Sequence, residues 1–359
     1  MNRRQALRQF HRSRTTDERW LPGESGSEGV GRRTWLKRLG AAVVGVGAAK
    51  ALDNVVVGYG VVTGTNLTEQ SMASLVSAPF AWNDRWVEVP GGRIELSNGG
   101  ERLSLRGAGS RSFIVGETTP ERAREAAAAV GVDPDAAEQA VADIRAFREG
   151  AVRYEPLPFD EFGAAAAEGT ARPATTGLMR AILREVDPAA VAAFVGVHPS
   201  EPVALAPALA EAFREHTYYD LPRYAAGSVE DNVIMGAADL RRYFESPTSF
   251  EALASGETSG MFCYEFTFRS VQAFHAQPAL DQSPPVAACK VFDERHKHVY
   301  TALATVTRRD GDLVVPMTFV DYTHTTLYDD LNLRGVMGEG LNGYTSRHRA
   351  TELRWWSSG

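Results

Sequence analysis

Apolar and polar residues alternate along residues 81–117, as they do in β-strands that bury one face. Four short runs follow this period, at residues 86–89, 93–96, 103–105 and 112–115. They are separated by Pro-Gly-Gly, Asn-Gly-Gly and Gly-Ala-Gly, which are strong turn sequences. The pattern predicts a small antiparallel sheet, or a set of hairpins, within residues 52–117.

Helical signals dominate residues 118–214. Thr119-Pro120 and Asp133-Pro134 each place a capping side chain before a proline, which predicts two helix starts. Further helices are expected at residues 176–185, 187–195 and 204–216. A Pro-, Gly- and Ala-rich passage at 155–176 is interpreted as a linker. No repeat, Walker-type loop or dinucleotide fingerprint occurs in the chain, and residues 70–215 indicate no function.

The pattern changes again from Tyr218 onward. A helix is expected at 231–244, and a second helix at 264–277 is expected to begin beside Cys263. Strand-like runs follow at residues 286–292, 299–307 and 313–320, the last two joined by a hairpin turn at 309–312. The predicted fold class is α+β, with a helix packed on an antiparallel sheet in a C-terminal domain at 215–359. The small β region at 52–117 and the helical region at 118–214 precede this domain.

Charge is spread unevenly along the 359 residues. Residues 1–51 contain eleven Arg and Lys against four acids, a net +7, so the remainder carries −7 − 7 = −14. Such an acidic body is a poor match for nucleic acid, and no nucleic-acid partner is expected. Lysine occurs only four times. An acidic, Lys-poor and Arg-rich composition is typical of salt-adapted extracellular proteins, although a GC-rich genome gives much of the same bias.

The N-terminal segment, residues 1–51, resembles a twin-arginine export signal or anchor. Arg32-Arg33-Thr34-Trp35-Leu36-Lys37 precedes a weakly hydrophobic Gly/Ala-rich run at 39–49, which is short for a membrane span. Ala49-Lys50-Ala51 offers a cleavage site. Apolar residues resume at 55–62, so an uncut signal could instead attach the protein to the membrane. The protein is therefore expected to be extracellular or at the cell surface.

Three residues of the C-terminal domain suggest a chemistry. Cys263 opens a predicted helix, where the amide dipoles favour a nucleophilic thiolate. His298 heads one strand and Asp321 ends the next, so pairing of these strands would bring the two side chains together. Cysteine-based acyl transfer needs a thiolate, an imidazole that moves the proton and a carboxylate that orients it. The Cys263 amide is the expected oxyanion donor, and Tyr243 and Tyr264 are candidates for a second one.

These residues resemble the transglutaminase-like superfamily, with its papain-like core. The matching segments are Leu253-Ala-Ser-Gly256 with Gly260-Met-Phe-Cys263, then His298-Val-Tyr300 and Phe319-Val-Asp321-Tyr-Thr323. The Cys–His and His–Asp spacings are 35 and 23 residues. The resemblance covers residues 215–345. It implies a Cys-His-Asp enzyme that acts on amide bonds of proteins or peptides, as a peptidase, an amidase or a cross-linking acyltransferase. It implies no metal and no organic cofactor.

Other readings of the same residues stay open. A lone Cys263 could be a small buried hydrophobe. Two cysteines in an exported chain could form a Cys263–Cys289 disulfide, which would abolish the nucleophile. Asp293, His296, His298 and His324 could ligate a metal ion. Finally, the same fold could act without catalysis, as an extracellular binding or structural module.

Overall fold

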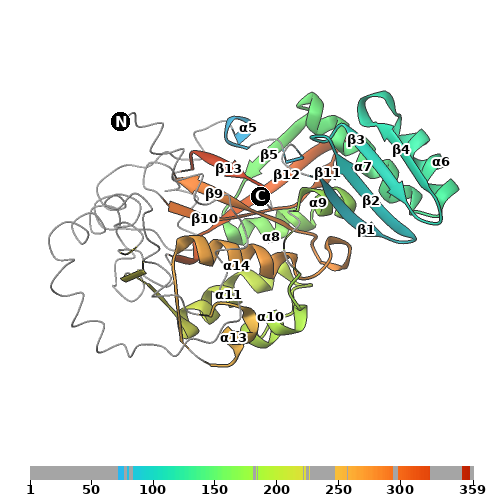
Figure 1. The fold of residues 1–359 in the computed structure, drawn as a ribbon. Helices are drawn as coiled ribbons and strands as arrows, with labels where there is room; N and C mark the ends of the chain where they lie inside the picture. The colour runs from blue at the N-terminus through green and yellow to red at the C-terminus, as the bar shows by residue number, and fades with distance from the viewer. Residues whose placement is uncertain are drawn as a thin grey trace, which may run out of the picture.

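The computed structural model describes residues 72–76, 79–80, 84–180, 183, 185–220, 222–223, 226, 247–256, 258–293, 298–323 and 350–355. These residues form an α+β fold, as predicted (Figure 1). The export signal expected at 1–51 and the helix expected at 231–244 lie outside the described residues. In the part of the chain that is described, no helix is long and apolar enough to cross a membrane.

The predicted small sheet is a four-stranded antiparallel meander. Its strands are β1 (Arg85–Val89), β2 (Gly92–Ser97), β3 (Arg102–Arg106) and β4 (Ser110–Ile114), in sequence order. Leu96 and Leu103 pair across β2 and β3 and are buried. At the first turn Gly91 has φ 79°, and a Cβ there would lie 1.8 Å from the carbonyl oxygen of Gly131. The meander is therefore held closely against the helix that ends at that residue.

Two helices start where the capping signals predict. Helix α6 (Pro120–Val130) follows Thr119, and α7 (Pro134–Glu149) follows Asp133, whose side chain accepts hydrogen bonds from two amides of the first turn. Both helices end at a glycine in the left-handed region. Helix α6 packs on β3 and β4. Other short elements are α5 (Met72–Leu75), which contacts β5 (Val152–Pro156), and the 3-10 turns at Val115–Glu117 and Ala279–Asp281.

A seven-stranded sheet occupies the middle of the molecule. Its order is β13-β9-β10-β12-β11-β6, with β5 also pairing with β12. The strands are β5 (Val152–Pro156), β6 (Thr170–Ala171), β9 (Ala287–Asp293), β10 (His298–Ala304), β11 (Thr307–Arg309), β12 (Asp312–Val320) and β13 (Glu352–Arg354). Only the β5–β12 pair is parallel. The predicted hairpin at 309–312 joins β11 to β12, with Asp310 and Gly311 at positive φ.

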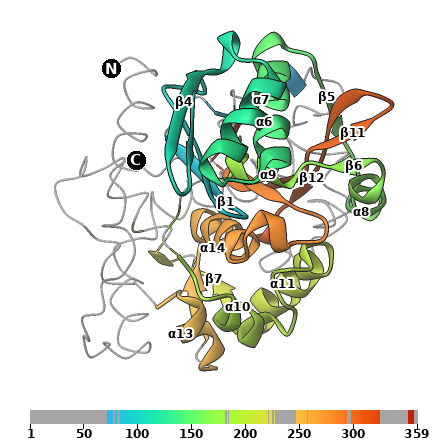
Figure 2. The same ribbon diagram turned by 90° about the vertical axis from the view of Figure 1, so that its right-hand side faces the viewer.

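Alternate side chains of this sheet enter two separate apolar cores. Cys289, Tyr300 and Phe319 belong to the first core, together with the meander, α6, α7 and α9 (Pro173–Met179). Ala288 and Leu303 belong to the second core. The helices of the second core are α8 (Phe159–Ala167), α10 (Pro188–Val195), α11 (Pro202–His216), α13 (Phe250–Ala254) and α14 (Cys263–His275) (Figure 2). Strand β10 is therefore buried on both faces.

The interpretation of residues 155–176 as a linker is wrong. This segment contains the end of β5, all of α8, β6 and the start of α9. Phe162 of α8 is completely buried in the second core. Strand β5 pairs with β12, which lies far along the chain. A local composition rich in Pro, Gly and Ala does not reveal such distant pairing, and this explains the error.

The helix expected at 176–185 is displaced toward the N-terminus. Helix α9 begins at Pro173 and ends at Met179. Arg180 then adopts an extended backbone, and its buried guanidinium donates hydrogen bonds to the carbonyl oxygens of Val286 (2.8 Å) and Gln277 (2.6 Å). These tertiary contacts end the helix where the local pattern would let it continue.

The central sheet also crosses the domain boundary expected at residue 215. Strands β5 and β6 precede this residue, yet they pair with β12 and β11, which follow it. The first core likewise joins side chains of the meander to side chains of β9, β10 and β12. The helical region and the C-terminal region thus share one sheet.

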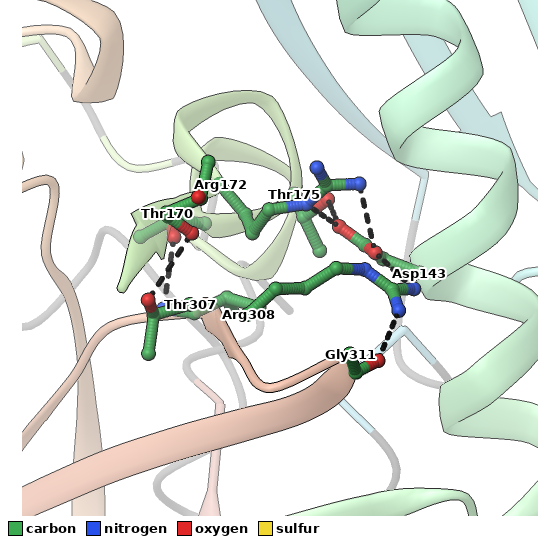
Figure 3. A network of polar contacts seen from close by, with 9 residues as sticks. Asp143, Thr170, Arg172, Thr175, Thr307, Arg308 and Gly311 are labelled. Atoms are coloured by element: carbon green, nitrogen blue, oxygen red, sulfur yellow. Dashed lines mark hydrogen bonds and ion pairs between the residues drawn. The ribbon is translucent and has the colours of Figure 1, made fainter. Parts of the chain in front are cut away.

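A buried carboxylate fastens α7 to this sheet (Figure 3). Asp143 of α7 is fully buried and accepts hydrogen bonds from Arg172 Nε (2.8 Å), Thr175 Oγ1 (2.7 Å) and Arg308 Nη2 (3.2 Å). Arg308 lies on β11 and also donates to the carbonyl oxygen of Gly311 (2.8 Å). Because a buried carboxylate without partners is costly, the three donors and the acid are mutually dependent.

We expect Asp143→Asn to lower the free energy of unfolding by about 3 kcal/mol, since it leaves two guanidinium groups without their shared anion. Urea denaturation measures this change. The matched control is Asp135→Asn on the same helix, where an exposed carboxylate pairs with Arg124 and the expected loss is below about 1 kcal/mol. Equal losses in the two variants would contradict the role given to Asp143.

Candidate active site

Cys263 is the first residue of α14. The preceding residue, Phe262, is extended (φ −129°, ψ 172°), so the chain leaves β8 (Ser259–Met261) and turns directly into the helix. The backbone amide of a first helical residue has no acceptor within its own helix and lies at the positive end of the helix dipole. Thr267 Oγ1 donates to the carbonyl oxygen of Cys263 (2.8 Å) and closes the first turn. Cys263 is 5% exposed.

Helix α14 lies against β9 and β10 and is fixed there by apolar and polar contacts. Its apolar side chains, among them Phe266 and Phe274, belong to the second core. Ser270 and Thr301 form a buried hydrogen bond between their hydroxyl groups (2.5 Å), which joins the helix to β10. Strand β10 is the strand that begins with His298. The helix that presents the cysteine is thus packed on the strand that presents the histidine.

His298 and Asp321 lie side by side, as the sequence predicts. Strands β10 and β12 pair antiparallel in a register that places Thr301 opposite Val320. His298 Nε2 and Asp321 Oδ2 are 2.6 Å apart, and both residues are buried. Asp321 Oδ1 accepts a hydrogen bond from the amide of Thr323 (2.9 Å). Both carboxylate oxygens are therefore engaged, and the acid is fixed in direction.

The side chain of Cys263 forms a hydrogen bond with His298. Burial by itself lowers the pKa of His298, but the charge and hydrogen bond of Asp321, with those of Cys263, outweigh burial and raise the pKa to about 10. A stabilised imidazolium is the counter-ion that a thiolate requires.

Tyr300 supports the histidine ring from the same strand. The rings of His298 and Tyr300 are stacked with centroids 5.9 Å apart and an interplanar angle of 19°. Phe319 of β12 meets Tyr300 edge-on at 6.5 Å. An aromatic residue two positions after the histidine points to the same side of the strand. Its packing restricts the rotation of the imidazole.

The alternative of a Cys263–Cys289 disulfide is wrong, because both cysteines are free thiols. Cys289 lies in the middle of β9, opposite Ala302, and its side chain belongs to the first core. Burial raises the pKa of the Cys289 thiol, and a hydrogen bond with the Ala302 backbone only partly opposes this rise. Cys289 is therefore a poor nucleophile.

The remaining candidate residues are only partly described. Tyr264 follows Cys263 and is half-buried, with Lys290 Nζ 5.8 Å from its ring centroid. Tyr243, His296 and His324 lie outside the described residues, and so does the side chain of Asp293. Among the described residues, no group of three or more His, Cys, Asp and Glu side chains could hold a metal ion. His298 is hydrogen-bonded to both Asp321 and Cys263.

Sequence reasoning missed a second group of residues beside Cys263. Strand β7 (Thr217–Tyr219) pairs in parallel with β8, immediately before the nucleophile. Asp220, Arg223 and Glu265 follow as buried charged residues close to the start of α14. A Glu at the third position of a helix is a known capping signal. Its partner Arg223, however, lies 42 residues away in the sequence, and no local sequence pattern predicts a contact over that separation.

A concave surface elsewhere on the molecule has a different chemical character. A cavity of about 470 Å³ lies beside the Asp143 cluster, lined by Glu121, Asp135, Glu138, Gln139, Arg172 and Arg308, with Pro120 and Ala142. Its lining contains no nucleophile and no histidine. Its lining does not include Cys263, His298 or Asp321, the three residues expected to carry out thiol chemistry.

Comparisons with protein-family models, with curated proteins and with solved structures find no match to this chain.

The raised pKa of His298 makes a prediction about stability and pH. A folded-state pKa above the ordinary value of 6.5 means that the contact with Asp321 stabilises the fold fully below about pH 6.5. This stabilisation is lost as the pH rises through about 10. In a Cys263→Ala background, where this thiol does not titrate, we expect Asp321→Asn to be less stable by on the order of 3 kcal/mol at about pH 7.

Urea denaturation at about pH 7 and about pH 10.5 measures this difference, which we expect to shrink at the higher pH because His298 is then neutral in both states. The control is Asp312→Asn, an exposed position at the start of the same strand. A gap for Asp321→Asn that is equal at both pH values would show that His298 is not charged in the native protein.

Proposed function

We propose that the protein is a cysteine-dependent acyl-transfer enzyme that acts on amide bonds. Cys263 is the nucleophile, His298 is the general base and acid, and Asp321 orients His298. The observation that carries the proposal is the buried His298–Asp321 hydrogen bond of 2.6 Å. The same imidazole also forms a hydrogen bond with the side chain of Cys263. One helix and two neighbouring strands bring these three residues together.

Each residue has a definite part in the reaction. The Cys263 thiolate attacks the carbonyl carbon of an amide, and the new oxyanion receives a hydrogen bond from the Cys263 amide. The imidazolium of His298 gives its proton to the departing amine, which breaks the C–N bond and leaves a thioester. Neutral His298 then takes a proton from water or from a second amine as this group attacks the thioester. The C–S bond breaks, which releases the acyl product and restores the Cys263 thiolate and the His298 imidazolium. Asp321 keeps the ring in one orientation throughout.

The finer fold assignment is part of the same proposal. The helix that begins with the nucleophile packs on a sheet whose adjacent strands contribute the histidine and the acid. This arrangement supports the resemblance to the transglutaminase-like superfamily, with its papain-like core. Export through the twin-arginine signal, a location outside the cell or at its surface, and a protein or peptide substrate belong to the proposal as well. They rest on the sequence of residues 1–51 and on this resemblance.

A second candidate is a catalytically inactive module that uses the same fold for binding. The small exposed fractions of Cys263 (5%) and His298 (4%) favour it, because a substrate carbonyl must reach the sulfur. The two candidates differ in the behaviour of the thiol. A catalytic thiolate reacts with a small electrophile at neutral pH, whereas a buried thiol that only packs does not.

We expect iodoacetamide at neutral pH to alkylate Cys263 at least about a hundredfold faster than Cys289, because only Cys263 has an imidazolium counter-ion. Mass spectrometry of the two cysteine-containing peptides measures both rates. We expect His298→Ala to slow the labelling of Cys263. Slow, equal labelling of both cysteines in the wild-type protein would favour the inactive module.

A screen of peptide amides at high salt, with hydroxylamine as an acyl acceptor, measures the activity itself. We expect Cys263→Ser and His298→Ala each to lower turnover by about a hundredfold or more. Cys289→Ser is the matched control and should retain turnover, since Cys289 faces the other core. Activity that survives Cys263→Ser would refute the assignment of the nucleophile.

A further inference from the structure

Glu265 lies at the third position of α14 and is buried. Its Oε2 accepts a hydrogen bond from the amide of Phe262 (3.2 Å), the residue before Cys263. Its Oε1 accepts a hydrogen bond from Arg223 Nη1 (2.7 Å). The carboxylate thus joins the backbone that leads into the nucleophile to a buried guanidinium. Both residues are nearly inaccessible to water, so this ion pair is weakly screened.

The segment that carries Arg223 is itself fixed to the chain before Cys263. Strand β7 pairs with β8, and the amide of Asp220 donates to the carbonyl oxygen of Met261 (2.8 Å). Asp220 Oδ1 in turn accepts a hydrogen bond from the amide of Arg223 (2.9 Å). The Arg223 guanidinium lies 5.0 Å from the ring centroid of Phe262. Residues 217–220 and Arg223 therefore contact residues 259–262.

Gly260 shows how close this contact is. A Cβ at this position would lie 2.7 Å from Asp220 Oδ2 and 2.9 Å from the hydroxyl oxygen of Tyr218. A larger residue would therefore displace the side chains of Asp220 and Tyr218. The absence of a side chain at this position of β8 thus lets Asp220 and Tyr218 lie close to the backbone that precedes Cys263.

We infer that Arg223 and Glu265 are positioning residues for the Cys263 thiolate. Glu265 holds the Phe262 amide, which lies one peptide unit before the Cys263 amide that would bind the oxyanion, and so limits the movement of the backbone that leads into it. Arg223 balances the charge of Glu265, which would otherwise stand two residues from the thiolate and oppose its formation. The inference rests on the proposed function, since it describes how the same nucleophile is prepared.

The charges around the pair are consistent with this balance. Burial raises the pKa of Glu265, and the charge and hydrogen bond of Arg223, the Phe262 amide and the charge of Arg269 only partly oppose this rise. Arg269 is otherwise bonded to Thr248 and Gln272. On the other side of the nucleophile stand His298 and Asp321, and Lys290 lies over Tyr264. Arg223 is the guanidinium in direct contact with the Glu265 carboxylate.

The test is the pH profile of Cys263 alkylation by iodoacetamide in four proteins: wild type, Arg223→Met, Glu265→Gln and the double variant. We expect Arg223→Met to react about tenfold more slowly at alkaline pH, where Glu265 is ionised without a counter-charge and opposes the thiolate. Removing Arg223 raises the pKa of Glu265 further, so the slowing should grow as the pH rises. We expect the double variant to recover the wild-type profile, since no uncompensated carboxylate remains. Arg223→Lys, which keeps the charge, should lie between wild type and Arg223→Met.

Arg180→Met is the matched control, because Arg180 is also a buried arginine and lies near the other end of α14, where it donates a hydrogen bond to the carbonyl oxygen of Gln277. It should lower stability and leave the alkylation profile unchanged. The inference would be overturned if the Arg223→Met profile matched the wild-type profile, or if the double variant failed to recover it. The proposed function would still stand in that case, provided that wild-type Cys263 is reactive. If wild-type Cys263 reacts as slowly as Cys289, the proposed function itself fails.

Discussion

The hydrogen bond between His298 and Asp321 is the interaction on which the arrangement depends. It is buried between two strands, so water neither competes for it nor screens it. Burial alone would favour a neutral imidazole, and the adjacent carboxylate, together with Cys263, reverses this preference and raises the pKa of His298 to about 10. Asp321 in turn keeps its position through the Thr323 amide. A charged histidine beside a thiol then follows from the pairing of β10 with β12.

Two other buried carboxylates of the described chain are paired with guanidinium groups. Asp143 is surrounded by two guanidinium groups and a hydroxyl, and Glu265 faces Arg223. Replacing such pairs by apolar residues often costs little, so buried ion pairs are poor evidence for stability alone. The two clusters differ in what they hold: Asp143 joins a helix to the sheet, whereas Glu265 joins two segments beside a nucleophile.

Much of this fold can be predicted from the sequence, because the capping, turn and alternation signals are local. Capping at Thr119 and Asp133, the turn at 309–312 and the alternation in the meander all act over a few residues, and each prediction is confirmed. The pairing of His298 with Asp321 was also accessible, since a short hairpin leaves few other arrangements. The disulfide was a reasonable alternative from composition. It fails because alternate residues of β9 face opposite cores.

The rest depends on distant contacts. Strand β5 enters the sheet in parallel beside β12, and no local pattern in its Ala- and Pro-rich surroundings marks this partner. The same holds for Arg223 and Glu265, whose ion pair spans 42 residues. Buried charged residues are scarce in protein interiors, but a sequence does not show which of its many Arg and Glu side chains are the buried ones.

The central claim is that Cys263 and His298 form a thiolate–imidazolium pair in the native protein. The most direct measurement is the ultraviolet absorbance of the thiolate across the neutral pH range, as the difference between wild type and Cys263→Ser. The account predicts a thiolate signal at neutral pH that disappears in His298→Ala. A difference spectrum without thiolate absorbance until the pH is strongly alkaline would contradict it.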